Sequence, residues 1–284
     1  MKTGLVLEGG ALRTIYSSGV TDGMLEMGLD FDFTVGVSAG IAYGVSFLSR
    51  QFGRNLELLV RYANDPRYMS FRNMLRPGNR HCYFGLDFSY VKIPMELLPF
   101  DYNAFARNKG SAEAVVTDLE TGRAVYIPLD FNDPNTKLLQ ATCAMPLLFP
   151  IFDINGIKCM DGGAADAIPW KRAFDVGCDK VVVVLTKERN YHRSPEKLQP
   201  LVNRVYRKYP EFIRTMQHRA EIYNRSREEL FEAEARGEVF IFAPDSTGGF
   251  SRTERDVGKI KALWQQGYEH AKAQKDALMR FLES

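Results

Sequence analysis

The chain has 284 residues, of which 45% are hydrophobic and 25% charged, and this average composition excludes a disordered or fibrous protein. Its 37 basic and 35 acidic residues leave a net charge of +2, too small for an overall electrostatic field that would attract nucleic acid. A chain of this length can bury a large hydrophobic core.

The first 50 residues predict two strand–helix units. An apolar run at Gly4–Leu7 ends in a glycine-rich turn, and Leu12–Met27 then carries apolar side chains at near-helical spacing. Phe31–Val37 has the pattern of a second strand, and Ile41–Arg50 that of a buried helix. This alternation predicts an α/β fold with a mainly parallel central sheet covered by helices.

Residues 65–100 differ from the segments on either side. They are rich in aromatic residues and methionine and are interrupted by Pro66, Pro77 and Pro94. Because the segment shows little periodicity, we expect irregular helices that lie over a core.

Two pairs of short strands follow, each pair around a turn signal. The first pair flanks Thr121-Gly122 and the second flanks Asn155-Gly156, which favours a type I′ turn because both residues tolerate positive φ. We therefore expect two β-hairpins. Their strands run over Ala112–Asp118, Arg123–Ile127, Phe149–Ile154 and Ile157–Met160.

The last third of the chain is predicted to be mainly helical. Pro169–Val176 suits a helix, and Lys180–Thr186 a fully buried strand that extends the parallel sheet. Long charged helices are expected over residues 189–236, then a strand at 239–243 and an amphipathic helix over 254–282.

The charge of this last third is uneven. From Lys187 to Arg236 there are 12 basic and 8 acidic residues, a surplus of four positive charges, which we interpret as a solvated face. We divide the chain into an α/β core over residues 1–186 and a mainly helical extension over 187–284. The strand at 239–243 in this extension is expected to pack on the core.

The cysteines and the hydropathy indicate where the protein resides. The four cysteines are widely spaced and form no Cys-x-x-Cys pair, which argues against a zinc site and a disulfide framework. No apolar stretch approaches the ~20 residues of a membrane-spanning helix or the core of a signal peptide. We expect a cytoplasmic protein whose membrane contact is peripheral, at the inner face.

The sequence Gly36-Val37-Ser38-Ala39-Gly40 has the Gly-x-Ser-x-Gly spacing of a nucleophile elbow. In such an elbow the serine occupies a tight strand-to-helix turn, and the glycines on either side let other backbone segments pass closely. An apolar run precedes this sequence and a helical pattern follows it, as the motif requires. Ser38 is therefore the predicted nucleophile, with Gly36 and Gly40 shaping its turn.

A serine hydroxyl needs a base, and we expect none of the four histidines to supply it. Only about 35 residues precede Ser38, too few for the strands that come before the elbow of an α/β-hydrolase. A carboxylate can act instead, and Asp161 ends a predicted hairpin strand where Gly162 and Gly163 permit close backbone approach. The alternative is that Asp161-Gly162-Gly163 is simply a turn.

A third motif lies between the first strand and the first helix. In Glu8–Arg13 the amides of Gly9, Gly10 and Ala11 lie where unpaired N–H groups and the helix dipole favour an anion. They could stabilise a tetrahedral oxyanion. A nucleotide phosphate is the alternative, although the loop lacks the spacings of dinucleotide-binding and ATP-binding motifs.

These three motifs together make the chain resemble the patatin-like phospholipases. Further agreement comes from Gly122 in the first hairpin, from Ala141–Pro146 running to Phe149-Pro150, and from Ile168-Pro169 after the Asp-Gly-Gly turn. The resemblance covers residues 4–186, and the remaining residues resemble the C-terminal extension found in a bacterial branch of this family.

The resemblance implies a three-layer α/β/α fold and an activity. Ser38 and Asp161 would form a dyad that hydrolyses acyl esters of lipids, in the manner of a phospholipase A or lysophospholipase. It implies a lipid or acyl-ester substrate, and neither a metal nor a diffusible cofactor. The aromatic segment Tyr68–Phe105 would form the acyl-chain groove or lid, and ordinary packing under loops explains it equally well.

The chain departs from the family pattern in the loop and near the acid. The family usually has Gly-Gly-Gly-x-Arg-Gly where this chain has Ala11 and Thr14 in place of the third and last glycines. Ala167 stands where the family often has asparagine. The alternative function is therefore a catalytically weak or inactive lipid-binding protein. Arg13 would either neutralise a phosphate or brace the loop, and we favour bracing.

Overall fold

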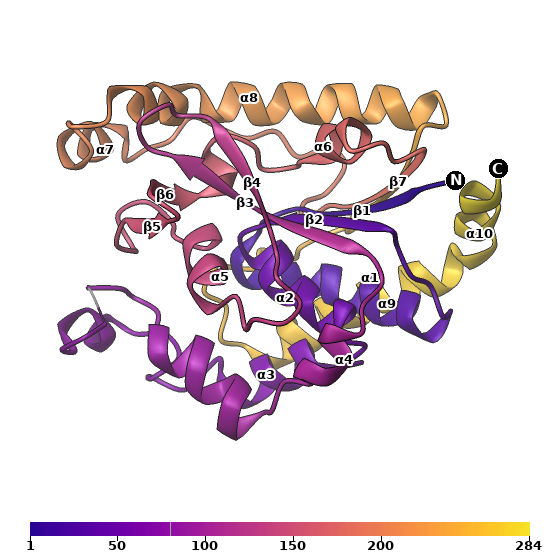
Figure 1. Ribbon diagram of the computed structural model, residues 1–284, viewed down its shortest axis with the longest axis horizontal. Helices are drawn as coiled ribbons and strands as arrows, with labels where there is room; N and C mark the ends of the chain where they lie inside the picture. The colour runs from indigo at the N-terminus through magenta and orange to yellow at the C-terminus, as the bar shows by residue number, and fades with distance from the viewer. Residues whose placement is uncertain (80) are drawn as a thin grey trace.

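A computed structural model describes residues 1–79 and 81–284. An eight-stranded sheet lies between two layers of helices (Figure 1). The strands are β1 (Thr3–Leu7), β2 (Phe33–Val37), β3 (Ser111–Asp118), β4 (Ala124–Pro128), β5 (Phe152–Ile154), β6 (Ile157–Asp161), β7 (Lys180–Val184) and β8 (Val239–Phe242). Their order is β5-β6-β3-β2-β1-β7-β8, with β4 also paired to β3. The neighbouring strands β3, β2, β1, β7 and β8 are parallel to one another. Strands β4 and β6 are antiparallel to β3, and β5 is antiparallel to β6.

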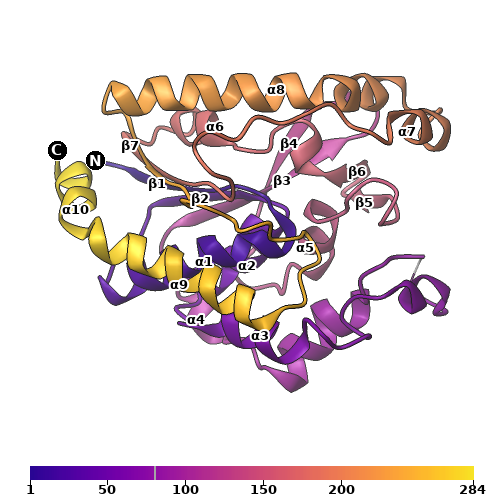
Figure 2. The ribbon, with the colours of Figure 1, turned by 180° about the vertical axis from the view of Figure 1, so that it is seen from behind.

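Helices cover both faces of the sheet. The α-helices are α1 (Ile15–Glu26), α2 (Ala39–Leu48), α3 (Arg54–Tyr62), α4 (Tyr102–Ala106), α5 (Thr136–Thr142), α6 (Trp170–Asp175), α7 (Gln199–Val205), α8 (Pro210–Ala235), α9 (Val257–Ala273) and α10 (Lys275–Glu283). Shorter or irregular helices are η1 (Ala11–Thr14), η2 (Phe71–Leu75), η3 (Phe88–Leu97) and η4 (Gly162–Ala164). Helices α6 and α8 lie over one face, and α1, α2, α3 and α9 lie over the other (Figures 1 and 2). The predicted three-layer α/β/α architecture is confirmed.

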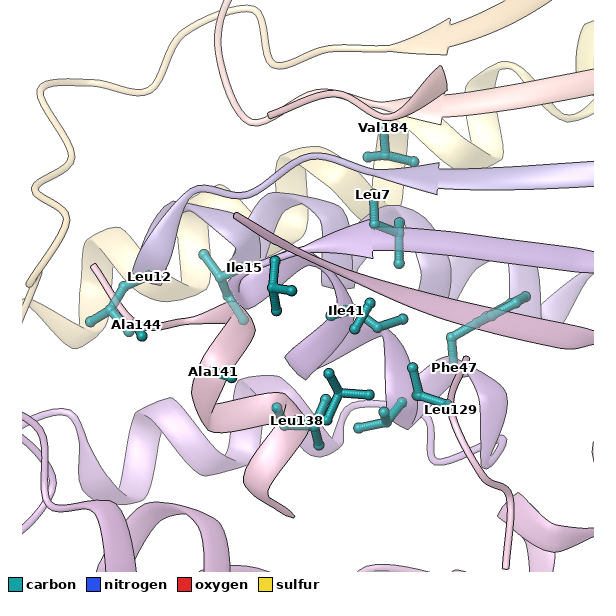
Figure 3. Close-up of a cluster of buried hydrophobic side chains, with 14 of the residues drawn as sticks. Leu7, Leu12, Ile15, Ile41, Phe47, Leu129, Leu138, Ala141, Ala144 and Val184 are labelled. Carbon is teal, nitrogen blue, oxygen red and sulfur yellow. The ribbon is translucent and has the colours of Figure 1, made fainter. Parts of the chain in front are cut away.

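Two hydrophobic clusters fill the spaces between the layers. The larger one lies between the sheet and the helices on the α2 face, and Figure 3 shows part of it. The smaller one lies between the sheet and the helices α6 and α8. Residues Val181–Val184 of β7 are completely buried, as expected for a parallel strand covered on both faces.

Helix α9 packs directly against α1, and each of the two helices carries a glycine where they cross. A Cβ atom on Gly19 would lie 2.0 Å from the carbonyl oxygen of Trp264, and one on Gly267 would lie 2.1 Å from that of Tyr16. The two backbones therefore approach too closely for any side chain at these positions. This crossing joins the end of the chain to the first strand–helix unit.

Apart from differences in their bounds, the predicted elements agree with the structure except in two places. Both hairpins form, and Asn155 and Gly156 both have positive φ, as the type I′ turn requires. The predicted helix over 254–282 is two helices that meet at Gln274. Residues 189–198 are not helical, so the charged helices begin only at Gln199. Within residues 65–100 the longest helix is η3, a π-helix whose wide turn accommodates Pro94.

Candidate active site

Ser38 lies in the turn between β2 and α2, with a strained backbone. Its φ of 54° and ψ of −133° are unusual for a residue with a side chain. Its N–H donates to the hydroxyl of Thr142 at 2.9 Å, and that hydroxyl donates to the carbonyl of Val115 at 2.6 Å. Thr142 therefore fastens the turn to β3. The Ser38 side chain remains 8% exposed.

The glycines around Ser38 are required by close packing. A Cβ atom on Gly40 would lie 2.4 Å from the carbonyl oxygen of Leu7, and one on Gly36 would lie 2.8 Å from the amide of Ile41. The turn is therefore pressed against the end of β1 and the first turn of α2. These contacts explain why the predicted elbow needs glycine at both positions.

Strand pairing brings Asp161 next to Ser38. One edge of β3 is occupied by β4, so β2 and β6 must both pair with the other edge. Along that edge Val37 lies opposite Val115, and Asp161 lies opposite the next residue, Val116. The ends of β2 and β6 therefore meet, although the two residues are far apart in sequence.

The Asp161 carboxyl is buried and has few neutralising contacts. It is 5% exposed, and its Oδ1 accepts a hydrogen bond from the Gly163 amide at 2.8 Å. Burial raises the pKa of this carboxyl, while a hydrogen bond from Ser38 and the positive charge of Arg219 oppose the rise. A carboxylate with a raised pKa is a stronger base, so Asp161 is suited to accept the proton of Ser38.

Gly162 and Gly163 permit this arrangement because backbone and carboxylate leave no space for side chains. A Cβ atom on Gly162 would lie 2.3 Å from the carbonyl of Val115, and one on Gly163 would lie 3.0 Å from Oδ1 of Asp161. Arg219 of α8 donates from Nε to the carbonyl of Gly163 at 2.7 Å. The turn after β6 is therefore held by β3 on one side and by α8 on the other.

The loop after β1 passes beside Ser38. A Cβ atom on Gly9 would lie 3.1 Å from the Cβ of Ser38, so the loop backbone is in direct contact with Ser38. Within residues 1–79 and 81–284, the amides of Gly9, Gly10 and Ala11 have no hydrogen-bond acceptor. Ala11 has φ of 49°, a conformation that costs a residue with a side chain ~1–2 kcal/mol. The chain thus retains the left-handed geometry that a glycine would adopt freely there.

Glu8 anchors this loop, a role that its sequence context did not indicate. Its buried carboxylate accepts hydrogen bonds from the hydroxyl of Thr186 at 3.1 Å and from that of Tyr223 at 2.6 Å. For Arg13 we expected a bracing role, but its side chain forms no hydrogen bond or ion pair within the described part of the chain, and its Nε is buried without an acceptor. Thr14 is fully buried where α1 begins.

Two pockets meet at Ser38. The first, which we call the apolar pocket, is lined mainly by aromatic and aliphatic side chains. Among them are Tyr43, Tyr68, Phe84, Tyr90, Ile93, Phe100, Phe105 and Phe149. The second, which we call the basic pocket, contains Asp161 and the loop after β1. Its cationic residues are Arg13, Lys187, Arg193, Arg219 and Arg252. The two pockets share the three residues Ala11, Ser38 and Met145.

No histidine lines either pocket among the residues that the structure describes. His270 is held by the hydroxyl of Tyr16 at 2.8 Å and by the carboxylate of Asp245 at 3.2 Å, so it has a structural role. Cys143 lies beside Ser38 in the apolar pocket, where burial raises the pKa of its thiol to about 12. Asp161, whose carboxyl accepts a hydrogen bond from Ser38, is therefore the candidate base.

The interpretation of the charge surplus after Lys187 as a solvated face is wrong for the residues that line the site. Arg219, from α8, lies beside the Asp161 turn, and Arg193 stacks on Tyr223 with its guanidinium 4.6 Å from the ring centre. Arg227 is buried and donates to the carbonyl of Glu188 at 2.7 Å. The surplus was a usable signal, but sequence did not show which of these arginines face inward.

Two features are absent from the described residues. No three histidine, cysteine, aspartate or glutamate side chains come together there in a way that could hold a metal ion. No helix there combines the length and the hydropathy needed to cross a bilayer.

The chain is similar to known proteins over much of its length. Residues 5–174 match the family model described as patatin-like phospholipase, and residues 209–283 match a domain of unknown function, DUF6363. The chain is 27% identical over 231 residues to the uncharacterized protein YjjU of Escherichia coli (strain K12), a match that covers 74% of this chain and 64% of YjjU. Among solved structures, VipD from Legionella pneumophila is similar with a TM-score of 0.48 and 11% identity, over 97% of this chain and 67% of VipD.

Proposed function

The chain belongs to the patatin-like phospholipase family, and on this premise we propose that it is a serine hydrolase of lipid acyl esters that uses Ser38 and Asp161. One observation carries the proposal: the ends of β2 and β6 meet on one edge of β3, so that Ser38 and Asp161 lie together beside three amides that have no acceptor among the described residues.

In the first step, Ser38 attacks the carbonyl carbon of the ester. Asp161 takes the proton of the Ser38 hydroxyl as the new C–O bond forms, and the carbonyl oxygen becomes an oxyanion. The amides of Gly9, Gly10 and Ala11 donate to this oxyanion. The position of Ser38 at the N-terminus of α2 adds the positive end of a helix dipole.

In the second step, the bond to the alcohol breaks and Asp161 returns its proton to the leaving alkoxide oxygen. The product is an alcohol and an acyl ester of Ser38. A water molecule then attacks the acyl carbonyl while Asp161 accepts a proton from it. When the intermediate collapses, Asp161 returns this proton to Oγ of Ser38, which releases the carboxylic acid and restores the enzyme.

The apolar pocket is proposed to hold the acyl chain. Most of its aromatic side chains come from the segment between Tyr68 and Phe105, the segment expected to form a groove or lid. Burying each CH₂ group of an acyl chain contributes ~0.8 kcal/mol. The pocket opens directly at Ser38, which would place the ester carbon next to the nucleophile while the chain lies among the aromatic rings.

A peripheral contact with a membrane surface is also proposed. Phe71 and Leu75 of η2 are 77% and 86% exposed, and α7 exposes Leu198 at its start with Leu201 and Val205. Both segments lie at the end of the molecule opposite the chain termini (Figures 1 and 2). Basic residues accompany these apolar side chains, and such a combination favours an anionic lipid surface. They are Arg72, Arg76, Arg204, Arg207 and Lys208.

The test is hydrolysis of a chromogenic acyl ester by the wild-type protein and by Ser38→Ala and Asp161→Asn. We expect both variants to lose at least about a hundredfold in kcat/KM. Asp153→Asn is the matched control, because Asp153 belongs to the same hairpin as Asp161 but is exposed. Equal rates in all four proteins would contradict a catalytic role for Ser38 and Asp161.

A further inference from the structure

The basic pocket contains more positive charge than the dyad needs. Its lining includes five cationic residues, whereas the acidic ones are Glu8, Asp161 and Glu196. Glu8 is bound by Thr186 and Tyr223, and Glu196 is paired with Arg219 at 3.4 Å. The acidic residues of the pocket are therefore engaged with other groups.

Three of the cationic residues have no counter-ion. Within the described residues, no carboxylate lies within ion-pair distance of Arg13, Arg193 or Arg252. Arg13 is only 9% exposed. The Nε atom of Arg13 and the Nη1 atom of Arg193 are both buried and have no hydrogen-bond acceptor within the described residues. Buried donors of a guanidinium normally have an acceptor, so these two point to an anionic group that the pocket accepts.

The electrostatic effects of these residues on one another agree with this view. Burial and the charge of Arg252 lower the pKa of Arg13. Burial and the charge of Arg193 lower the pKa of Arg219 to about 10. Like charges held together at partly buried positions repel one another, and a bound anion relieves that repulsion.

The aromatic rings of the pocket are already covered by cations. Lys187 lies 4.7 Å from the ring centre of Tyr191, and the guanidinium of Arg193 lies 4.6 Å from that of Tyr223. A quaternary ammonium group, as in a choline head group, needs such aromatic faces free. The pocket therefore suits an anionic head group and disfavours a zwitterionic one.

We propose that the basic pocket selects a head group of net negative charge on the alcohol side of the ester, so that acyl esters with an anionic phosphate-bearing head group are preferred to zwitterionic and neutral ones. The inference rests on the proposed function. The two pockets meet at Ser38, which places the acyl chain on one side of the scissile bond and the phosphate on the other.

This assignment gives the C-terminal third of the chain a role in specificity. Lys187, Arg193, Arg219 and Arg252 all lie beyond residue 174, where the patatin-like match ends. Arg219 and Arg252 belong to the segment that matches a domain of unknown function. The patatin-like core thus supplies the dyad, and the later residues supply most of the charge that selects the head group.

The test compares three substrates with the same palmitoyl chain and glycerol: palmitoyl lysophosphatidate, palmitoyl lysophosphatidylcholine and monopalmitoylglycerol, each below its micelle concentration. We expect the wild-type protein to give the highest kcat/KM with lysophosphatidate. In Arg193→Gln, the ratio of kcat/KM for lysophosphatidate to that for monopalmitoylglycerol should fall about tenfold, because a charge-assisted hydrogen bond is lost. Arg193→Lys should recover part of the ratio.

Arg225→Gln is the matched control, since Arg225 lies on α8 but is exposed and paired with Glu221. It should leave the ratio unchanged. Equal kcat/KM for lysophosphatidate and lysophosphatidylcholine in the wild-type protein, or for lysophosphatidate and monopalmitoylglycerol, would overturn the proposal, as would a preference that Arg193→Gln does not alter.

A binding measurement separates this proposal from the proposed function. We expect sn-glycerol 3-phosphate to raise the melting temperature of Ser38→Ala, and expect the rise to be smaller in Ser38→Ala combined with Arg193→Gln. This result supports the phosphate site even if no ester is hydrolysed. Stabilisation by lysophosphatidate alone would also support it and identify a lipid-borne phosphate as the ligand. Absence of stabilisation by either compound would overturn it.

Discussion

At the residue scale, the burial of Asp161 determines how activity depends on pH. Burial raises the pKa of its carboxyl above the ordinary value, and a base works only when it is deprotonated. The kcat/KM should therefore fall as the pH decreases through this raised pKa. The loss should begin at a higher pH than for an exposed carboxylate.

The measurement is kcat/KM for a soluble acyl ester from about pH 4 to about pH 9, with circular dichroism at each pH to establish that the protein stays folded. A constant kcat/KM down to about pH 4 in the folded protein would contradict the assignment of Asp161 as the base.

Thr142 carries a second prediction at this scale. Its hydroxyl accepts from the amide of Ser38 and donates to the carbonyl of Val115. Thr142→Val keeps the shape but leaves both backbone groups without a partner, at ~1–3 kcal/mol each. We expect the free energy of unfolding to fall by about 2 kcal/mol and kcat to fall with it, because the turn at Ser38 loses its anchor.

Chemical denaturation and the kinetics of ester hydrolysis measure both effects. Thr142→Ser is the control, because it keeps the hydroxyl and should retain most of the stability and activity. If Thr142→Val equals the wild type in both measurements, the hydroxyl has no part in fixing the turn.

At the element scale, the contact between α1 and α9 depends on glycine. A Cβ atom on Gly267 would lie 2.1 Å from the carbonyl oxygen of Tyr16. Gly267→Ala gains ~1 kcal/mol of helix propensity, but the helices must separate, and overpacking of this kind costs ~1–3 kcal/mol. Since a backbone atom is the obstacle, we expect a net loss of about 2 kcal/mol in the free energy of unfolding.

Gly258→Ala is the control for that measurement by chemical denaturation. Gly258 lies in the first turn of the same helix, and the nearest atom to an added Cβ is Oδ1 of the Asp256 side chain at 3.1 Å. This variant should keep the stability of the wild type or exceed it. If the two substitutions change the free energy of unfolding equally, the close crossing of the helices is not the reason for glycine at Gly267.

The elements also show how far sequence reasoning reaches. The strands, the two hairpins and the Ser38 turn follow from local patterns of apolar residues and glycines, and these were predicted correctly. The break at Gln274 has no comparable local signal, whereas Pro94 marks the segment of the irregular helix η3.

The candidate site also has residues that the sequence identifies and residues that it does not. Ser38, Asp161 and the loop glycines stand in short motifs, so sequence could identify them. Glu8 and the inward-facing arginines could not be assigned, because their roles depend on which side of α8 and of the preceding loop faces the sheet. Only the register of β6 on β3 brings Asp161 to Ser38.

At the scale of the whole molecule, the exposed apolar side chains of η2 predict an effect on vesicle-bound substrate. Phe71→Ser combined with Leu75→Ser should lower binding to vesicles that contain anionic phospholipid by about tenfold, because two apolar side chains leave the lipid interface. Vesicle sedimentation measures the binding.

Phe52→Ser is the matched control, since Phe52 is also exposed but packs on Trp264 and Tyr268 instead of lying on η2. It should leave vesicle binding as in the wild type. If the η2 variant binds vesicles as tightly as the wild type, the end of the molecule that carries η2 is not the face that meets the membrane.

The central claim is that Ser38 is the nucleophile and that Asp161 activates it. Its most direct test is reaction of the folded protein with a fluorophosphonate, followed by mass spectrometry of the proteolytic peptides. The account predicts a single phosphonylated residue, Ser38, with labelling that is much slower in Asp161→Asn and unchanged in Asp153→Asn. Labelling of another serine, or none at Ser38 in the folded wild-type protein, would contradict it.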